Sequence, residues 1–115
     1  MLKIGEFARM CGVSTQTLRY YDSAGILRAD HIDPHTGYRY YDHDKLAMFQ
    51  EIQSLNHAGF SLREIKLLHN GSKAARAHLL ACKREEFEQK TQHYAQSLAL
   101  LEQLEQQLAL EDLDL

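Results

Sequence analysis

Hydrophobic residues recur at helical spacing in four short stretches of the first 71 residues. The first stretch, residues 4–11, ends at a glycine, and Ser14 can cap a second helix on which Val13 and Leu18 are placed to pack as a hydrophobic staple. Gly25 ends that second helix. Two short helices joined by a tight glycine-containing turn form a helix-turn-helix candidate, although such pairs also occur in proteins that never bind DNA.

The following segment changes from helical to strand periodicity. Asp33-Pro34 and Thr36-Gly37 have the composition of turns, and the aromatic residues 38–41 after them alternate as a strand does. The sequence therefore predicts a β-hairpin, with Arg39 at its tip between two tyrosines.

Two more helices follow the hairpin. Asp42 can cap the first, which ends near Gly59. Ser61 and Glu64 form a capping box for the second, which stops at Gly71. The apolar faces predicted for these helices are Leu46, Phe49, Ile52 and Leu55, and then Leu62, Ile65 and Leu68.

The rest of the chain is predicted to be one long helix. All six glycines and the single proline lie at or before Gly71, and a helix from about Ala74 to Leu110 would be roughly 55 Å long. It could fold back on the head or pair with a second chain, and we favour a coiled coil because the helix far outreaches so small a head. We predict a head over residues 1–71 and a dimerisation helix over residues 72–115. The heptad stripe expected to mediate the pairing is Leu80, Phe87, Tyr94, Leu101 and Leu108, with Leu98 and Leu104 in a partial second column.

Composition places the chain among ordinary globular proteins, with 44% apolar and 25% charged residues. No apolar run reaches the length of a membrane span and no signal peptide is visible, so we expect a cytoplasmic protein. Cys11 and Cys82 form no CxxC pair, and we expect each to be a small core hydrophobe rather than a metal ligand. The sequence predicts no cofactor.

Net charge alone does not favour nucleic-acid binding. The chain carries −3 overall, and residues 1–71 contain eight Lys/Arg against eight Asp/Glu. A neutral head can still bind DNA if its basic groups share one face, because DNA binding depends on the electrostatic field at the contact surface and not on the net charge.

The second helix and the hairpin carry the candidate DNA contacts. The N-terminal part of the second helix of a helix-turn-helix enters the major groove. Gln16 is the candidate base reader, whereas Arg19 and the Tyr20 hydroxyl are better placed for phosphates. Adjacent residues point about 100° apart, so at most one of Tyr20 and Tyr21 faces the DNA. The residues expected nearest the DNA are Ser14, which is also a cap, and Thr15, Gln16, Thr17 and Arg19 on the helix, and Tyr38 and Arg39 on the hairpin acting as a wing.

Taken in order, these motifs closely resemble the MerR family of bacterial transcriptional regulators. The resemblance covers the whole head, over Ile4–Ala8, Gly12–Ser14, Thr17–Asp22, Gly25–Leu27, Gly37–Tyr41 and Gly59–Ile65. It implies a mainly α fold: a winged helix-turn-helix head with a small β-hairpin wing, followed by a long helix that pairs antiparallel with its twin. It also implies that a homodimer binds a palindrome in an overlong promoter spacer and bends and untwists that DNA for RNA polymerase.

The same resemblance bears on individual residues. Thr17, Arg19, Tyr20, Tyr38 and Arg39 match the family's DNA-contacting positions, and Arg63 matches a second backbone contact near the third and fourth helices. Metal-sensing members carry cysteines at the start of the long helix and in a loop after it, a pattern this sequence lacks. The sequence therefore does not identify the effector. The chain is either a short regulator or the N-terminal part of a longer one, and we favour the second because no sensing chemistry is visible.

Two other classes of protein deserve comparison. A coiled-coil adaptor or structural protein whose head binds protein fits the composition, but it leaves Arg19 and the Tyr-Arg-Tyr run unexplained. An enzyme is disfavoured, because the sequence has no Ser/His/Asp set, no phosphate loop and no HExxH motif.

Overall fold

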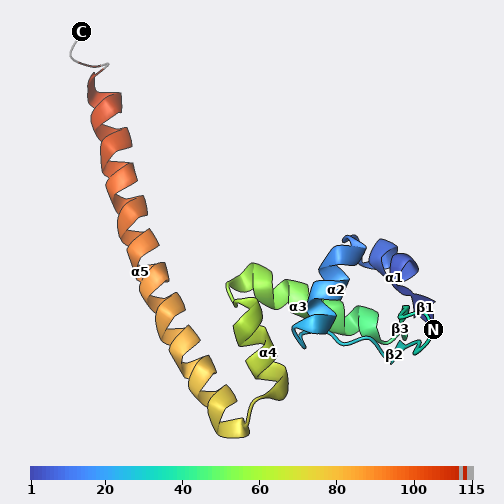
Figure 1. The fold of residues 1–115 in the computed structure, drawn as a ribbon. Helices are drawn as coiled ribbons and strands as arrows, with labels where there is room; N and C mark the ends of the chain where they lie inside the picture. The colour runs from blue at the N-terminus through green and yellow to red at the C-terminus, as the bar shows by residue number, and fades with distance from the viewer. Residues whose placement is uncertain (112, 114–115) are drawn as a thin grey trace. The chain divides into compact units, whose positions relative to one another are not determined.

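The computed structural model describes residues 1–111 and 113, and the chain forms two compact units that divide between Ser72 and Lys73. The first unit is a winged helix-turn-helix and the second is one long helix, which confirms the predicted mainly α fold. In chain order the elements are β1 (Leu2–Lys3), α1 (Ile4–Cys11), α2 (Thr15–Ser23), β2 (His31–Ile32), β3 (Arg39–Tyr41), α3 (Lys45–Ala58), α4 (Leu62–Asn70) and α5 (Lys73–Glu111) (Figure 1).

The turn between α1 and α2 is built from local signals in the sequence. Gly12 adopts a left-handed conformation with φ 73°, which lets its N–H donate back to the carbonyl of Arg9 at 3.3 Å. Ser14 then begins α2, because its hydroxyl oxygen accepts the N–H of Thr17 at 3.2 Å. The predicted cap is confirmed, and it fixes where the second helix starts.

The wing is part of a three-stranded antiparallel sheet with the order β1-β3-β2. The predicted hairpin is confirmed, and its turn is held by the Asp33 carboxylate, which accepts the N–H groups of His35 and Thr36 at 2.8 and 3.1 Å. These bonds lower the pKa of Asp33 below its usual value. Two details were predicted wrongly or not at all. Arg39 lies in β3 and not at the tip, and β1 was not predicted because two residues show no alternation.

Helices α3 and α4 complete the head. The prediction that Asp42 caps α3 is wrong: the N-cap is Asp44, and the Asp42 N–H donates to the Asp30 carboxylate at 2.7 Å. The helix ends at Gly59, as predicted, with φ 114°. The predicted capping box of α4 is present in both directions, between Ser61 and Glu64, and α4 stops before Gly71.

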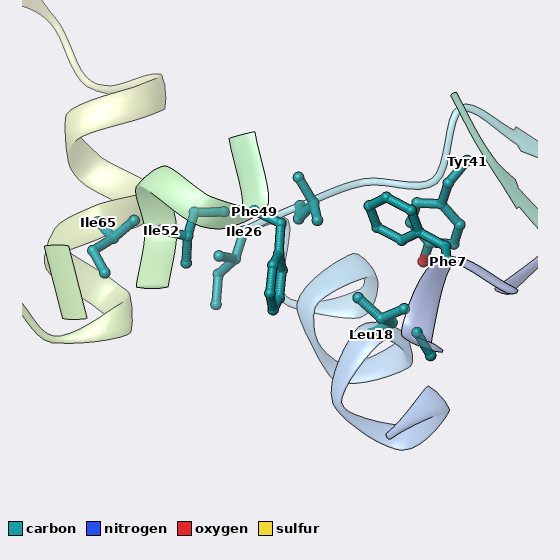
Figure 2. Packing of buried hydrophobic residues seen from close by; sticks show 9 residues of the cluster. Phe7, Leu18, Ile26, Tyr41, Phe49, Ile52 and Ile65 are labelled. Atoms are coloured by element: carbon teal, nitrogen blue, oxygen red, sulfur yellow. The ribbon is translucent and has the colours of Figure 1, made fainter. Parts of the chain in front are cut away.

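One hydrophobic core joins the helices to the wing. Tyr41 of β3 stacks on Phe7 of α1 with ring centroids 4.7 Å apart, and Leu18 of α2 belongs to the same cluster (Figure 2). Because the wing and α2 share this core with α1, their side chains are held in a defined arrangement. The buried members of the cluster are Phe7, Ala8, Leu18, Ile26, Leu27, Tyr41, Phe49, Ile52 and Ile65.

The long helix α5 has 39 residues, which gives it a length of roughly 58 Å. From Glu88 to Glu111 every side chain is exposed in the single chain. Tyr94, Leu101 and Leu108 of the predicted stripe lie in this segment and are 65%, 52% and 64% exposed, and Leu80 before it is 51% exposed, whereas Phe87 is half-buried. Among the described residues, no helix combines the length and the apolarity needed to cross a membrane.

The capping box gives a direct test of the head's energetics. Replacing Ser61 with Ala removes the acceptor for the Glu64 N–H, and the free energy of unfolding should fall by about 1 kcal/mol. Denaturant unfolding followed by circular dichroism measures this. The matched control is Ser54→Ala, an exposed serine inside α3, which should leave stability nearly unchanged. Equal losses from both variants would contradict the capping role.

Candidate DNA-binding surface

The first turn of α2 presents one long polar side chain that makes no hydrogen bond to the described residues. Gln16 is exposed, whereas Thr15 and Thr17 are half-buried. The Thr17 hydroxyl lies 3.0 Å from the Ser14 hydroxyl, so these two groups satisfy each other. Gln16 therefore has the reach and the unused donor and acceptor that reading a base edge requires.

Arg19 and the wing line one groove of about 440 Å³. Tyr38 and Arg39 approach from the wing, and Lys3 and Arg9 add two cations from β1 and α1. Sequence reasoning missed Lys3 and Arg9, although the exposure of Arg9 follows from its place opposite the core residues Phe7 and Ala8. The groove is lined by four basic side chains and a single acidic one, Glu6, which is the composition of a phosphate-binding surface.

Arg39, which the sequence analysis placed at the hairpin tip, is instead held by an ion pair. Its Nε donates to Oδ2 of Asp22 at 2.7 Å, and its side chain is only 27% exposed. Asp22 is 7% exposed, and its second oxygen accepts the Ala29 N–H at 3.0 Å. The last turn of α2 is thereby joined to β3 and to the segment that precedes the wing.

The two adjacent tyrosines of α2 face different environments, as predicted. Tyr20 is 57% exposed. Tyr21 packs against Phe49 with ring centroids 6.2 Å apart, and burial raises its pKa above the ordinary value. Tyr20 is therefore the more accessible of the two tyrosines.

Tyr20 and the predicted Arg63 line a second groove, of about 210 Å³, together with Lys66. The Lys66 ammonium and the Arg28 guanidinium converge over Gly25, where each would lie 3.2–3.3 Å from an added β-carbon. Among the described residues no carboxylate forms a salt bridge with these cations. Arg63 also sits in the first turn of α4, where the helix dipole disfavours a cation, so this cluster attracts an anion.

The two cysteines differ from each other. Cys11 packs against the core as expected, and burial raises the pKa of its thiol to about 11. Cys82 is exposed, so the prediction that it is a core hydrophobe is wrong; its Sγ lies 3.5 Å from Nε2 of His78 one turn earlier. Among the described residues no three potential metal ligands come together.

These features define a winged helix-turn-helix protein whose second helix is flanked by two basic grooves. The chain belongs to the MerR HTH family of regulatory proteins, whose family model matches residues 2–71. The family consists of regulators and not of enzymes, which confirms the expectation from the sequence.

Curated relatives include two regulators from Bacillus subtilis (strain 168). The chain is 34% identical to the multidrug-efflux transporter 2 regulator over 99 residues, which is 85% of this chain and 36% of that protein. It is 40% identical to the multidrug-efflux transporter 1 regulator over 63 residues, which is 55% of this chain and 23% of that protein. The chain thus spans only about a quarter to a third of the length of these relatives.

Solved structures that are similar to this chain include members of the same family. A MerR-family transcriptional regulator from Bacillus cereus has 31% identity and a TM-score of 0.59, over 84% of this chain and 74% of that chain. HiNmlR, a MerR family regulator lacking the sensor domain and bound to promoter DNA, has 25% identity and a TM-score of 0.60, over 94% and 87%. The EcmrR-DNA complex in EcmrR-RPo has 31% identity and a TM-score of 0.61, over 82% and 38%.

The contrast between the cysteines predicts their reactivity. With its pKa at about 11 instead of 9.0, Cys11 has a thiolate fraction at pH 8 that is about a hundredfold below that of an ordinary thiol. A disulfide reagent at pH 8 should therefore modify exposed Cys82 first. Mass spectrometry of the native protein measures both rates, and the Cys82→Ser variant isolates Cys11. Rapid modification of Cys11 in the folded variant would contradict its burial.

Proposed function

We propose that this chain is a sequence-specific DNA-binding transcription regulator that binds a palindromic promoter spacer as a homodimer and distorts it. The observation that carries the proposal is the position of α2 between two basic grooves. Arg19 lines one groove and its neighbour Tyr20 lines the other, so the grooves open on different sides of the helix. A helix lying in the major groove has a sugar-phosphate backbone on each side, and this arrangement supplies cations to both.

The contacts divide into two kinds. Gln16 and its threonine neighbours on α2 face the base edges, where Gln16 can bond bidentately to adenine. The wing and Arg19 contact one backbone segment, and Arg63 with Tyr20 contacts the other. Such phosphate contacts fix register and affinity but carry little sequence information.

Dimerisation follows from the exposed face of α5. Each apolar side chain of the stripe is worth on the order of 1.5 to 3 kcal/mol on full burial, and a second helix can supply that burial. Charge favours an antiparallel pair: residues 73–90 carry five Lys/Arg against three Asp/Glu, while residues 91–115 carry five Asp/Glu and no Lys/Arg. An antiparallel dimer places the basic half of each helix beside the acidic half of its partner.

A symmetric dimer presents two heads and so requires two half-sites of opposite orientation. HiNmlR bound to promoter DNA and the EcmrR-DNA complex in EcmrR-RPo support promoter DNA and RNA polymerase as partners. With these partners the protein acts in the cytoplasm. The distortion of the spacer is proposed from the family alone, and its effector is left open.

The assignment of Gln16 to a base and Arg19 to a phosphate can be tested by DNA titration. Gln16→Ala should cost roughly 1 to 3 kcal/mol on a duplex selected by the unmodified protein and much less on a scrambled duplex, because a base contact is lost. Arg19→Ala should weaken both duplexes alike and lower the salt slope by about one, because a phosphate contact is lost. Fluorescence anisotropy over a range of salt measures both quantities.

Gln96→Ala on α5 removes the same side chain outside the head and serves as the control. The assignment is reversed if Gln16→Ala weakens both duplexes equally while Arg19→Ala changes sequence preference. Failure of the unmodified protein to enrich any sequence from a random library would refute the proposed function itself.

The dimer is tested by one added charge. Leu101→Glu places a carboxylate in the apolar stripe and should yield monomers at micromolar concentration, as measured by analytical ultracentrifugation. Gln103→Glu adds the same charge two residues away, outside the stripe, and should leave the dimer intact. A monomeric unmodified protein, or a Leu101→Glu variant that still pairs, would show that the stripe does not hold a dimer.

A further inference from the structure

Asp22 is a buried carboxylate on which three segments of the head converge. It belongs to the last turn of α2, and its two oxygens accept one bond from Arg39 of β3 and one from the backbone of Ala29. A buried carboxylate is costly unless it is paired, and here both oxygens are used. The resulting link fixes the direction from which Arg39 enters the groove.

The Asp22 bond occupies only part of the Arg39 guanidinium. Nε is the donor, and the described residues provide no hydrogen-bond partner for the two terminal amino groups. Arg39 nevertheless lines the groove that Arg19 and Tyr38 share. A guanidinium held at one edge presents its other donors in a fixed fork, which matches the oxygens of a phosphate.

We propose that Asp22 is a positioning residue that holds Arg39 so that its terminal amino groups meet a DNA phosphate. This rests on the proposed function, and it goes further because it assigns a role to an acidic residue beneath a DNA-binding groove. Without Asp22 the long side chain of Arg39 would sample several rotamers, and ordering it on DNA would reduce affinity.

The sign of the effect separates this role from simple electrostatics. A negative charge beside the groove repels DNA, so removing it should strengthen binding if charge alone matters. If Asp22 positions Arg39, removing the carboxylate should weaken binding instead. Asn at this position can still accept the Ala29 N–H, but its amide group then faces the Nε–H of Arg39 as a second donor.

The test compares Asp22→Asn with Glu6→Gln, which removes the same charge from the lining of the same groove. The probe is the duplex that the unmodified protein selects from a random library. Asp22→Asn should bind about tenfold more weakly, with a salt slope lower by about one, whereas Glu6→Gln should bind equally or more tightly. Wild-type affinity and slope in a folded Asp22→Asn protein would overturn the proposal and leave the proposed function standing.

A double-mutant cycle links the loss to Arg39. Asp22→Asn combined with Arg39→Ala should bind no more weakly than Arg39→Ala alone, and additive losses would show that Asp22 does not act through Arg39. If circular dichroism shows that Asp22→Asn is unfolded, Arg39→Lys decides the matter. Lys keeps the charge but cannot hold Asp22 and present a fork, so it should also bind about tenfold more weakly, and full affinity would refute the proposal.

Discussion

The arrangement of the head depends on the stacking of Tyr41 against Phe7. The sheet of the wing has strands of only two or three residues, and a sheet of that size is not stable by itself. Tyr41 is the only side chain of its three strands that is buried, and its ring lies parallel to that of Phe7 within 5°. Burial, followed by the negative charge of Asp22, raises the pKa of the Tyr41 hydroxyl to about 12. Through this contact the wing takes its position from the core of the helices.

The functional surface follows from that shared core. Leu18 is buried in the same cluster as Tyr41, so the face of α2 that carries Gln16 and Arg19 has a fixed direction relative to the wing. The ion pair between Asp22 and Arg39 adds a polar contact between α2 and β3. Two grooves result, and α2 lies between them. A neutral head can in this way offer a basic surface, because the two grooves are lined by six basic side chains and one acidic one.

Local chemistry made much of the fold predictable. The Ser14 cap and the Ser61–Glu64 capping box are short-range signals, and both are present as predicted. Contacts between distant positions were not predictable in this way: the bond between Asp22 and Arg39 spans 17 positions, and the bond from the Asp42 N–H to Asp30 spans 12. The Asp42 cap was a local error, because α3 begins at Lys45 with Asp44 as its N-cap. The DNA contacts assigned to α2 and the wing stay a prediction, and Lys3 and Arg9 line the same groove as Arg19 only because the chain folds.

In the proposed complex, two heads related by twofold symmetry each contact the DNA backbone on both sides of α2. Hydroxyl-radical footprinting of the selected duplex tests it most directly, because it reports protection of each sugar along both strands. We expect two equivalent footprints placed symmetrically about the centre of the duplex, each made of two protected backbone segments. A single protected stretch with no partner across the centre would contradict it.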